Sequence, residues 1–158
     1  MEKRIRPPPP EWRFQVWEIL PGLFLSKRLV DPAGYESLNV DVIVSLDDWE
    51  CTWSPPVPTN DIYVHFPIEV ADIIDPKVRE VARFVANLVS TGKRVLVQCV
   101  QGLNRSAMVL ARALMFLGKS PERAIRLIRY KRGQDEGYGA LGNESFVRWL
   151  LAEQSLEP

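Results

Sequence analysis

Cysteine and histidine are scarce in this chain, and both shortages exclude classes of protein. The 158 residues include two cysteines, which are too few for a disulfide scaffold and are typical of a protein from a reducing compartment. His65 is the only histidine, so a histidine-rich metal site is excluded. We therefore expect a cytoplasmic protein without a disulfide framework.

Net charge and long apolar runs are also absent. The chain carries 20 basic and 20 acidic residues, so its formal net charge is zero, and this balance argues against a nucleic-acid-binding scaffold. No apolar run reaches the length of a membrane-spanning helix, and residues 1–7 contain no hydrophobic signal core. We expect neither nucleic acid nor a membrane among the partners of this protein.

One compact domain fits the length and the composition. With 46% hydrophobic residues, a chain of 158 residues can bury a full core, and no internal repeat divides it. Four consecutive prolines stand near its start, at Pro7–Pro10. We expect a flexible proline-rich tail over residues 1–12, a single domain over residues 13–158, and a monomer.

Strand-like and helix-like patterns alternate along this domain. The pattern predicts strands over residues 14–19, 23–26, 41–46, 62–66 and 94–98. It predicts helices over residues 31–38, 76–91, 105–117, 121–131 and 144–153. This order is typical of an α/β fold in which helices flank a mainly parallel central sheet. Ligands of such sheets bind beyond the carboxyl ends of the strands.

The segment Gln98–Ser106 is the most informative part of the sequence. Cys99 follows the apolar strand residues Val95–Val97, five residues come next, and Arg105 then opens an apolar helix. The thiol therefore lies at a strand-to-helix turn, where backbone N–H groups and the positive end of a helix dipole converge. Such a position beside an arginine favours the nucleophilic thiolate over the thiol. The alternative is a buried structural cysteine that has an arginine nearby by chance.

The residues of this loop suit a phosphate dianion. The forked guanidinium of Arg105 and the loop N–H groups can hold three phosphate oxygens through charge-assisted hydrogen bonds. Glycine in the middle of the loop allows the backbone to direct N–H groups inward, and Ser106 can donate a hydrogen bond to the sulfur when thiolate leaves. The predicted phosphate-binding residues are Val100, Gln101, Gly102, Leu103, Asn104 and Arg105.

The loop and its flanking elements resemble the signature of the cysteine-based protein tyrosine phosphatase superfamily, and specifically of its small dual-specificity phosphatases of compact microbial type. The resemblance continues through Leu20–Ser26, Val42–Leu46 and Tyr63–Glu69, which are similar to strands of that family. Leu141–Phe146 resembles the closing Asn-x-x-Phe segment of the family. The resemblance implies a dual-specificity phosphatase-like fold, with Asn143 bracing the phosphate loop. Asn143 also reads as a plain N-cap of the last helix, and both roles are compatible.

Two positions depart from the family pattern. Gln98 stands where the family has histidine, and its amide can donate a hydrogen bond but carries no charge. We therefore expect Cys99 to ionise less readily than in a relative with histidine. Val70 stands where the family has the aspartate that serves as general acid, and valine cannot transfer a proton. A shifted loop would present Asp72 instead, which we favour, or Glu69 as the second candidate.

Two charged groups read as solvated. Asp47, Asp48 and Glu50 follow a predicted buried strand, from which they can approach the rim of the same pocket, although acidic loop residues are usually solvated. The predicted helix over residues 121–131 and the residue after it carry a basic stripe, and a solvated helix face accounts for it. The stripe consists of Arg123, Arg126, Arg129, Lys131 and Arg132.

The resemblance implies a two-step phosphatase mechanism. Cys99 attacks phosphorus, Asp72 or Glu69 protonates the leaving oxygen, and water hydrolyses the cysteinyl-phosphate, while Arg105 holds the phosphoryl group. No metal or other cofactor is needed. Relatives that act on highly phosphorylated lipids carry extra basic residues in the loop, and this loop has none before Arg105. We expect phosphorylated proteins or peptides as substrates, with phosphotyrosine first and phosphoserine or phosphothreonine next, and a phosphate or sulfate anion as a ligand of the loop.

Two other functions are compatible with these residues. A phosphate-binding pseudophosphatase would account for Gln98 and for the displaced acid. A sulfur carrier or an arsenate reductase would also place a low-pKa cysteine in an anion-binding loop. The Arg105–Ser106 pair and the segment around Asn143 argue against this last class.

Overall fold

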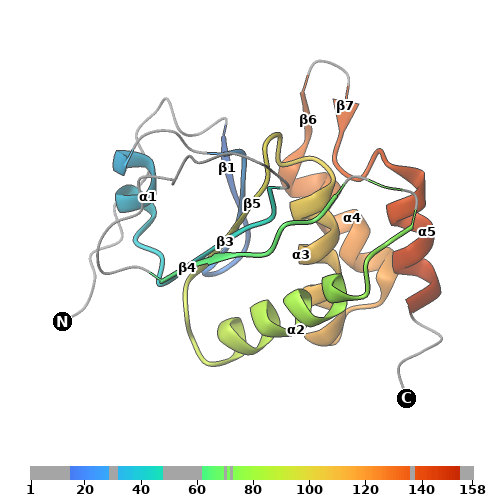
Figure 1. Ribbon diagram of the computed structural model, residues 1–158, viewed down its shortest axis with the longest axis horizontal. Coiled ribbons are helices and arrows are strands. Elements are labelled where there is room, and N and C mark those ends of the chain that lie inside the picture. Colours follow the sequence, from blue (N-terminus) through green and yellow to red (C-terminus); the bar gives the residue numbers. More distant parts are fainter. Residues whose placement is uncertain are drawn as a thin grey trace.

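A central sheet of five strands organises the chain (Figure 1). The computed structural model describes residues 15–28, 32–47, 62–69, 71, 73–135 and 138–153, and the expected tail lies outside them. The order of the strands is β1-β2-β5-β3-β4, and every neighbouring pair is parallel except β1 and β2. The strands are β1 (Val16–Leu20), β2 (Leu23–Ser26), β3 (Val42–Ser45), β4 (Ile62–His65) and β5 (Val95–Gln98).

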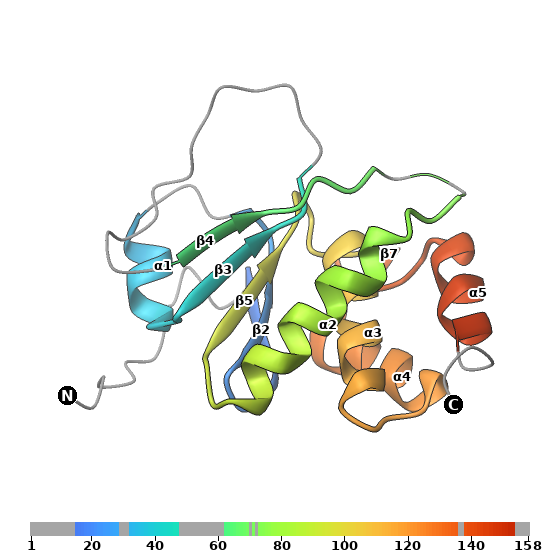
Figure 2. The ribbon, with the colours of Figure 1, turned by 60° about the horizontal axis from the view of Figure 1, so that its bottom comes forward.

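Helices cover both faces of this sheet. They are α1 (Pro32–Leu38), α2 (Lys77–Ser90), α3 (Arg105–Phe116), α4 (Pro121–Arg132) and α5 (Glu144–Glu153). Figure 2 shows α1 on one side and the other four helices on the opposite side. The predicted α/β fold with a mainly parallel sheet is confirmed. A ribbon of two short strands, β6 (Gln134–Asp135) and β7 (Tyr138–Gly139), was not predicted, because two residues are too few to show an alternating pattern.

The central strand β5 separates two apolar cores. Val95 and Val97 belong to the larger core under α2 to α5, and Leu96 belongs to the smaller core under α1. This alternation follows from the two-residue period of a strand, and all four residues of β5 are buried because both faces of the sheet are covered. Cys99 continues into the larger core, whereas the Gln98 side chain contacts α1.

The carboxyl ends of the parallel strands meet at one edge of the sheet. Ser26 and Ser45 both pair with Gln98, and Ser45 pairs with His65 on its other side. The chain segments that follow these strands continue to hydrogen-bond to one another, since Leu46 N donates to the Gln98 carbonyl at 2.9 Å. This edge is therefore where side chains from separate segments come together.

A buried ion cluster attaches α5 to the rest of the fold. Arg79 of α2 donates to both carboxylate oxygens of Glu153 at 2.7 Å, and Arg112 of α3 donates to one of them at 3.2 Å. Burial raises the pKa of the Glu153 carboxyl, but the hydrogen bonds and charges of the two arginines outweigh it and lower the pKa below its usual value. Within the described ranges, no helix is both long and apolar enough to cross a membrane.

Candidate active site

The turn between β5 and α3 surrounds the thiol of Cys99 with hydrogen-bonding groups. Gly102 N donates to Sγ at 3.3 Å, and Ser106 Oγ lies 3.1 Å from Sγ. The helix α3 begins at Arg105, so its first N–H groups and its positive dipole end lie beside the loop. Cys99 is 2% exposed. The sulfur is therefore buried within hydrogen-bond distance of a backbone N–H and a hydroxyl.

The conformation of the loop depends on Gly102. Its φ of +63° lies in the left-handed region, which side chains with a Cβ rarely adopt. A Cβ atom at this position would lie 3.0 Å from the carbonyl carbon and oxygen of Ser26 and 3.1 Å from Lys27 N. Glycine therefore lets the loop pack directly against the end of β2 while its N–H faces the sulfur.

A cavity of about 250 Å³ opens over this loop. It is lined by the thiol residue and by five of the six predicted phosphate-binding residues, while Gly102 is buried behind them. The lining residues are Cys99, Val100, Gln101, Leu103, Asn104 and Arg105. Among the lining residues that the structure describes, Arg105 alone carries a positive charge.

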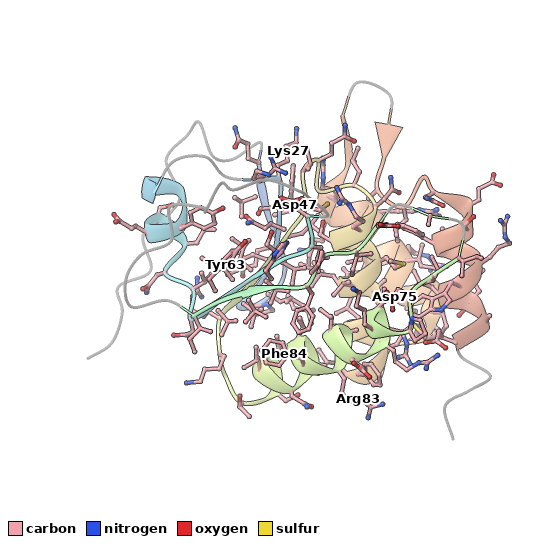
Figure 3. The ribbon with its side chains drawn as sticks, in the orientation of Figure 1. Lys27, Asp47, Tyr63, Asp75, Arg83 and Phe84 are labelled. Carbon is pink, nitrogen blue, oxygen red and sulfur yellow. The ribbon has the colours of Figure 1, made fainter. Side chains whose placement is uncertain are left out.

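Asp47, which Figure 3 labels, follows β3 at the carboxyl edge of the sheet and forms an ion pair with Arg105. Its Oδ1 is 3.9 Å from Arg105 Nη2, and its Oδ2 accepts a hydrogen bond from Arg28 Nε at 2.8 Å. Asp47 is 3% exposed, so the interpretation of this residue as solvated is wrong. This carboxylate follows a central strand, is buried at the edge of the sheet and is flanked by two arginines. The nearby Asp48 and Glu50 lie outside the described residues.

The segment after β4 contacts the other side of Arg105. Arg105 Nη1 donates to the Ile68 carbonyl at 3.3 Å, and the exposed Glu69 is the next residue. Glu69, the second candidate for the general acid, thus directly follows a residue that contacts Arg105. Val70 and the first candidate, Asp72, lie outside the described residues.

Gln98 contacts a tyrosine and not the thiol. Its Oε1 accepts a hydrogen bond from Tyr35 Oη of α1 at 2.8 Å, and Gln98 is 1% exposed. The side chain therefore points to the face of the sheet opposite Cys99. The influence of Gln98 on the loop passes through the backbone, which the sequence alone did not indicate.

Asn143 uses its side chain and its backbone for different contacts. Its Oδ1 accepts hydrogen bonds from Ser145 N at 3.0 Å and from Phe146 N at 3.4 Å, which caps α5. Its backbone N–H donates to Oδ1 of Asn104 in the loop at 3.0 Å. Asn143 therefore caps α5 with its side chain and contacts the loop with its backbone.

Two arginines of the basic stripe contact backbone carbonyls near the loop. Arg132 is 3% exposed, and it donates to the carbonyls of Gly102 at 2.8 Å and Gln101 at 3.2 Å. Arg129 donates to the Ala140 and Leu141 carbonyls at 3.2 and 3.0 Å. The interpretation of the stripe as a solvated face is therefore wrong for Arg132, whereas Arg129 is exposed and also donates to two carbonyls.

A periodic signal for Arg132 is present in the sequence. The buried residues of α4 include Ile125 and Ile128, and Arg132 follows at the next helical interval of four. This spacing places Arg132 on the apolar face of the helix. The positive charge alone suggested exposure, but the interval of three and then four residues indicates burial.

Comparisons with known proteins agree with this geometry. The family model described as "Dual specificity phosphatase, catalytic domain" matches residues 25–155. No curated protein matches the chain.

Three solved structures illustrate the likeness of the fold. A mouse protein in complex with zinc tungstate, assigned to the dual specificity phosphatases, is 22% identical, with a TM-score of 0.75 over 99% of this chain and 93% of that chain. Tk-PTP in the active form is 24% identical, with a TM-score of 0.70 over 89% and 97% of the two chains. The human tyrosine phosphatase-like serine/threonine/tyrosine-interacting protein is 18% identical, with a TM-score of 0.69 over 91% and 98%. At these identities the likeness shows a common fold.

Proposed function

Because the chain belongs to the dual-specificity phosphatase family, and is thus a protein phosphatase, we propose that Cys99 is the nucleophile that removes phosphate from protein side chains. The observation that carries this proposal is the position of Cys99 Sγ, within 3.3 Å of both Gly102 N and the Oγ of Ser106, which lies in the first turn of α3. Both contacts stabilise a thiolate, and Arg105 lines the same cavity.

The reaction takes place in two displacements. In the first, a sulfur–phosphorus bond forms at Cys99, the bond to the leaving oxygen breaks, and a carboxylic acid gives that oxygen a proton. In the second, the carboxylate takes a proton from water, the water oxygen bonds to phosphorus, and the sulfur–phosphorus bond breaks. The hydroxyl of Ser106 stabilises the thiolate that leaves. Arg105 and the loop N–H groups hold the phosphoryl oxygens throughout.

Asp72 is our first candidate for the acid, and Glu69 is the second. The hydrogen bond from Arg105 to the Ile68 carbonyl supports both, because it holds the start of their segment beside the loop. In single-turnover assays, loss of the acid slows hydrolysis of alkyl phosphates far more than hydrolysis of an ester with a good leaving group. The variants Asp72→Asn and Glu69→Gln identify the residue that shows this difference.

The cavity supports a phosphate monoester as the substrate. The loop has no basic side chain between Cys99 and Arg105, so within the loop itself a polyanionic headgroup would meet only the guanidinium of Arg105. This favours phosphotyrosine, and then phosphoserine and phosphothreonine, on a protein or peptide. Phosphate and sulfate bind to the same loop, and the enzyme acts in the cytoplasm as a monomer without metal.

Hydrolysis of p-nitrophenyl phosphate tests the assignment. The wild type turns over, and Cys99→Ser loses turnover but still binds inorganic phosphate. A serine variant with full activity would overturn the role of Cys99. Phosphate binding by a wild type that releases no product would identify a phosphate-binding pseudophosphatase instead.

A further inference from the structure

Arg132 lies at the last turn of α4, behind the loop that holds Cys99. Its guanidinium contacts the Gln101 and Gly102 carbonyls and lies 3.7 Å over the ring of Trp17 from β1. On the basis of the proposed function, we infer that Arg132 is a positioning residue. It holds two peptide groups of the loop so that their N–H groups face the sulfur and the phosphate.

The first of these peptide groups joins Gln101 to Gly102. A trans peptide is planar, and its carbonyl and N–H point in opposite directions. The carbonyl of Gln101 accepts from Arg132 Nη2 at 3.2 Å, and the N–H of the same peptide, that of Gly102, donates to Cys99 Sγ at 3.3 Å. A rotation of this peptide that removed the carbonyl from Arg132 would also turn the N–H away from the sulfur.

The next two peptide groups are held in the same manner. The Gly102 carbonyl accepts from Arg132 Nε at 2.8 Å, so the N–H of Leu103 points away from Arg132. The Leu103 carbonyl accepts from Leu141 N at 2.8 Å. Leu141 in turn is held through its carbonyl by Arg129, one helical turn before Arg132. The end of α4 therefore fixes three consecutive peptide planes of the loop.

The ring of Trp17 covers the guanidinium of Arg132. A planar guanidinium can stack on a ring and donate to two carbonyls at the same time, whereas a lysine ammonium has neither the plane nor the fork. The burial of Arg132 reduces competition by water for these hydrogen bonds. The variant Arg132→Lys therefore keeps the positive charge but removes the two-carbonyl geometry of the guanidinium.

The test compares Arg132→Met and Arg132→Lys with the wild type. Arg126→Met is the control, because Arg126 is exposed on the same helix. Two readouts report on the loop: the pH midpoint of Cys99 alkylation, followed by mass spectrometry of the Cys99 peptide, and the inhibition constant of inorganic phosphate. Thermal unfolding of each variant is recorded alongside.

We expect both Arg132 variants to raise the alkylation midpoint and to weaken phosphate inhibition about tenfold. We expect kcat/KM to fall roughly 10- to 100-fold, which is less than the effect of deleting an oxyanion donor itself. Trp17→Leu shifts both readouts in the same direction by a smaller amount, and Arg126→Met behaves as the wild type.

Two outcomes would overturn the inference. One is a wild-type midpoint and a wild-type phosphate constant in both Arg132 variants. The other is a wild-type Arg132→Lys beside an impaired Arg132→Met, since the charge and not the fork would then suffice. Alkylation needs no turnover, and calorimetry gives a phosphate dissociation constant that replaces the inhibition constant if the wild type is inactive. An inactive wild type would therefore count against the proposed function and would leave the test of Arg132 intact.

Discussion

Asp47 Oδ1 lies 3.9 Å from Nη2 of Arg105, and both residues are buried. Arg28 donates to the other carboxylate oxygen, so Asp47 connects the end of β3 to two arginines at the phosphate loop. An arginine buried at this point needs a compensating charge when no phosphate is bound. Asp47 supplies this charge and keeps the guanidinium of Arg105 at the edge of the cavity.

Asp47→Asn removes the charge and keeps the shape of the side chain. We expect the free energy of unfolding to fall by about 2 kcal/mol, because Arg28 loses a charged acceptor and Arg105 loses a neighbouring opposite charge. We also expect kcat/KM to fall roughly tenfold, since the orientation of Arg105 is less restricted. Urea denaturation and steady-state kinetics measure both quantities.

The matched control is Asp75→Asn, which alters an exposed carboxylate paired with Lys77 at 3.6 Å. Its effect on stability should stay within about 0.5 kcal/mol. Equal stability and activity in Asp47→Asn and the wild type would show that Asp47 does not orient Arg105.

Gly102→Ala tests the close packing of the loop against β2. The added methyl group meets the backbone of Ser26 and Lys27 at 3.0–3.1 Å, so the loop must move and the Gly102 N–H must leave the sulfur. We expect kcat to fall roughly 100-fold or more, as for the loss of an oxyanion donor. Gly92→Ala is the control, because Gly92 has a φ of +81° but no atom within 4 Å of the added Cβ. It should cost about 1 kcal/mol of stability without a change in kcat. Equal kcat values for the two variants would contradict this prediction.

Glu153→Gln tests the ion cluster that attaches α5. The folded protein holds the pKa of Glu153 below 4.5, so the charged carboxylate stabilises the fold above that pH. This contribution is lost as pH falls through the lowered pKa of the folded state. We expect the variant to be less stable by roughly 3 kcal/mol at pH 7, and the difference to shrink below about pH 4.5.

Urea denaturation at a series of pH values measures this difference. Glu144→Gln is the control, since the Glu144 side chain is 89% exposed and pairs with Arg148 on the surface. A difference between wild type and Glu153→Gln that stays constant from pH 7 to pH 3 would contradict the linkage.

Gln98→His introduces the residue found in the family pattern. We expect Cys99 alkylation to reach its midpoint at a lower pH in this variant, because a histidine can carry a positive charge close to the loop. Tyr35→Phe is the companion variant, since it removes the donor to Gln98 Oε1 without a change of charge. It should lower stability by about 1–3 kcal/mol and leave the midpoint unchanged. An identical midpoint in Gln98→His and the wild type would show that the residue before Cys99 does not tune the thiol.

Periodicity made the elements of the fold predictable. The helices α1 to α5 and the strands β1 to β5 lie within two residues of their predicted ranges. The helices repeat apolar residues at the helical period, and the buried strands β2, β3 and β5 are short runs of mostly apolar residues. The cysteine loop was equally clear, since a short spacing between Cys99 and Arg105 needs no knowledge of distant residues. Local signals were sufficient wherever the structure depends on neighbours in the chain.

Buried charges were not predictable in the same way. Asp47 is buried beside Arg28 and Arg105, which belong to other segments of the chain, and no local sequence pattern predicts these contacts. Arg132 carried a helical signal, but its role depends on carbonyls 30 residues earlier in the chain. The side chain of Gln98 points away from Cys99 because successive residues of a strand face opposite sides of the sheet.

The most direct measurement of the central claim is a rapid acid quench during turnover of a phosphotyrosyl peptide, followed by mass spectrometry of the Cys99 peptide. We predict a phosphoryl group on Cys99 within the first turnover, and none in Cys99→Ser. Product release without phosphorylated Cys99, or a phosphoryl group on another residue, would contradict the claim that Cys99 is the nucleophile.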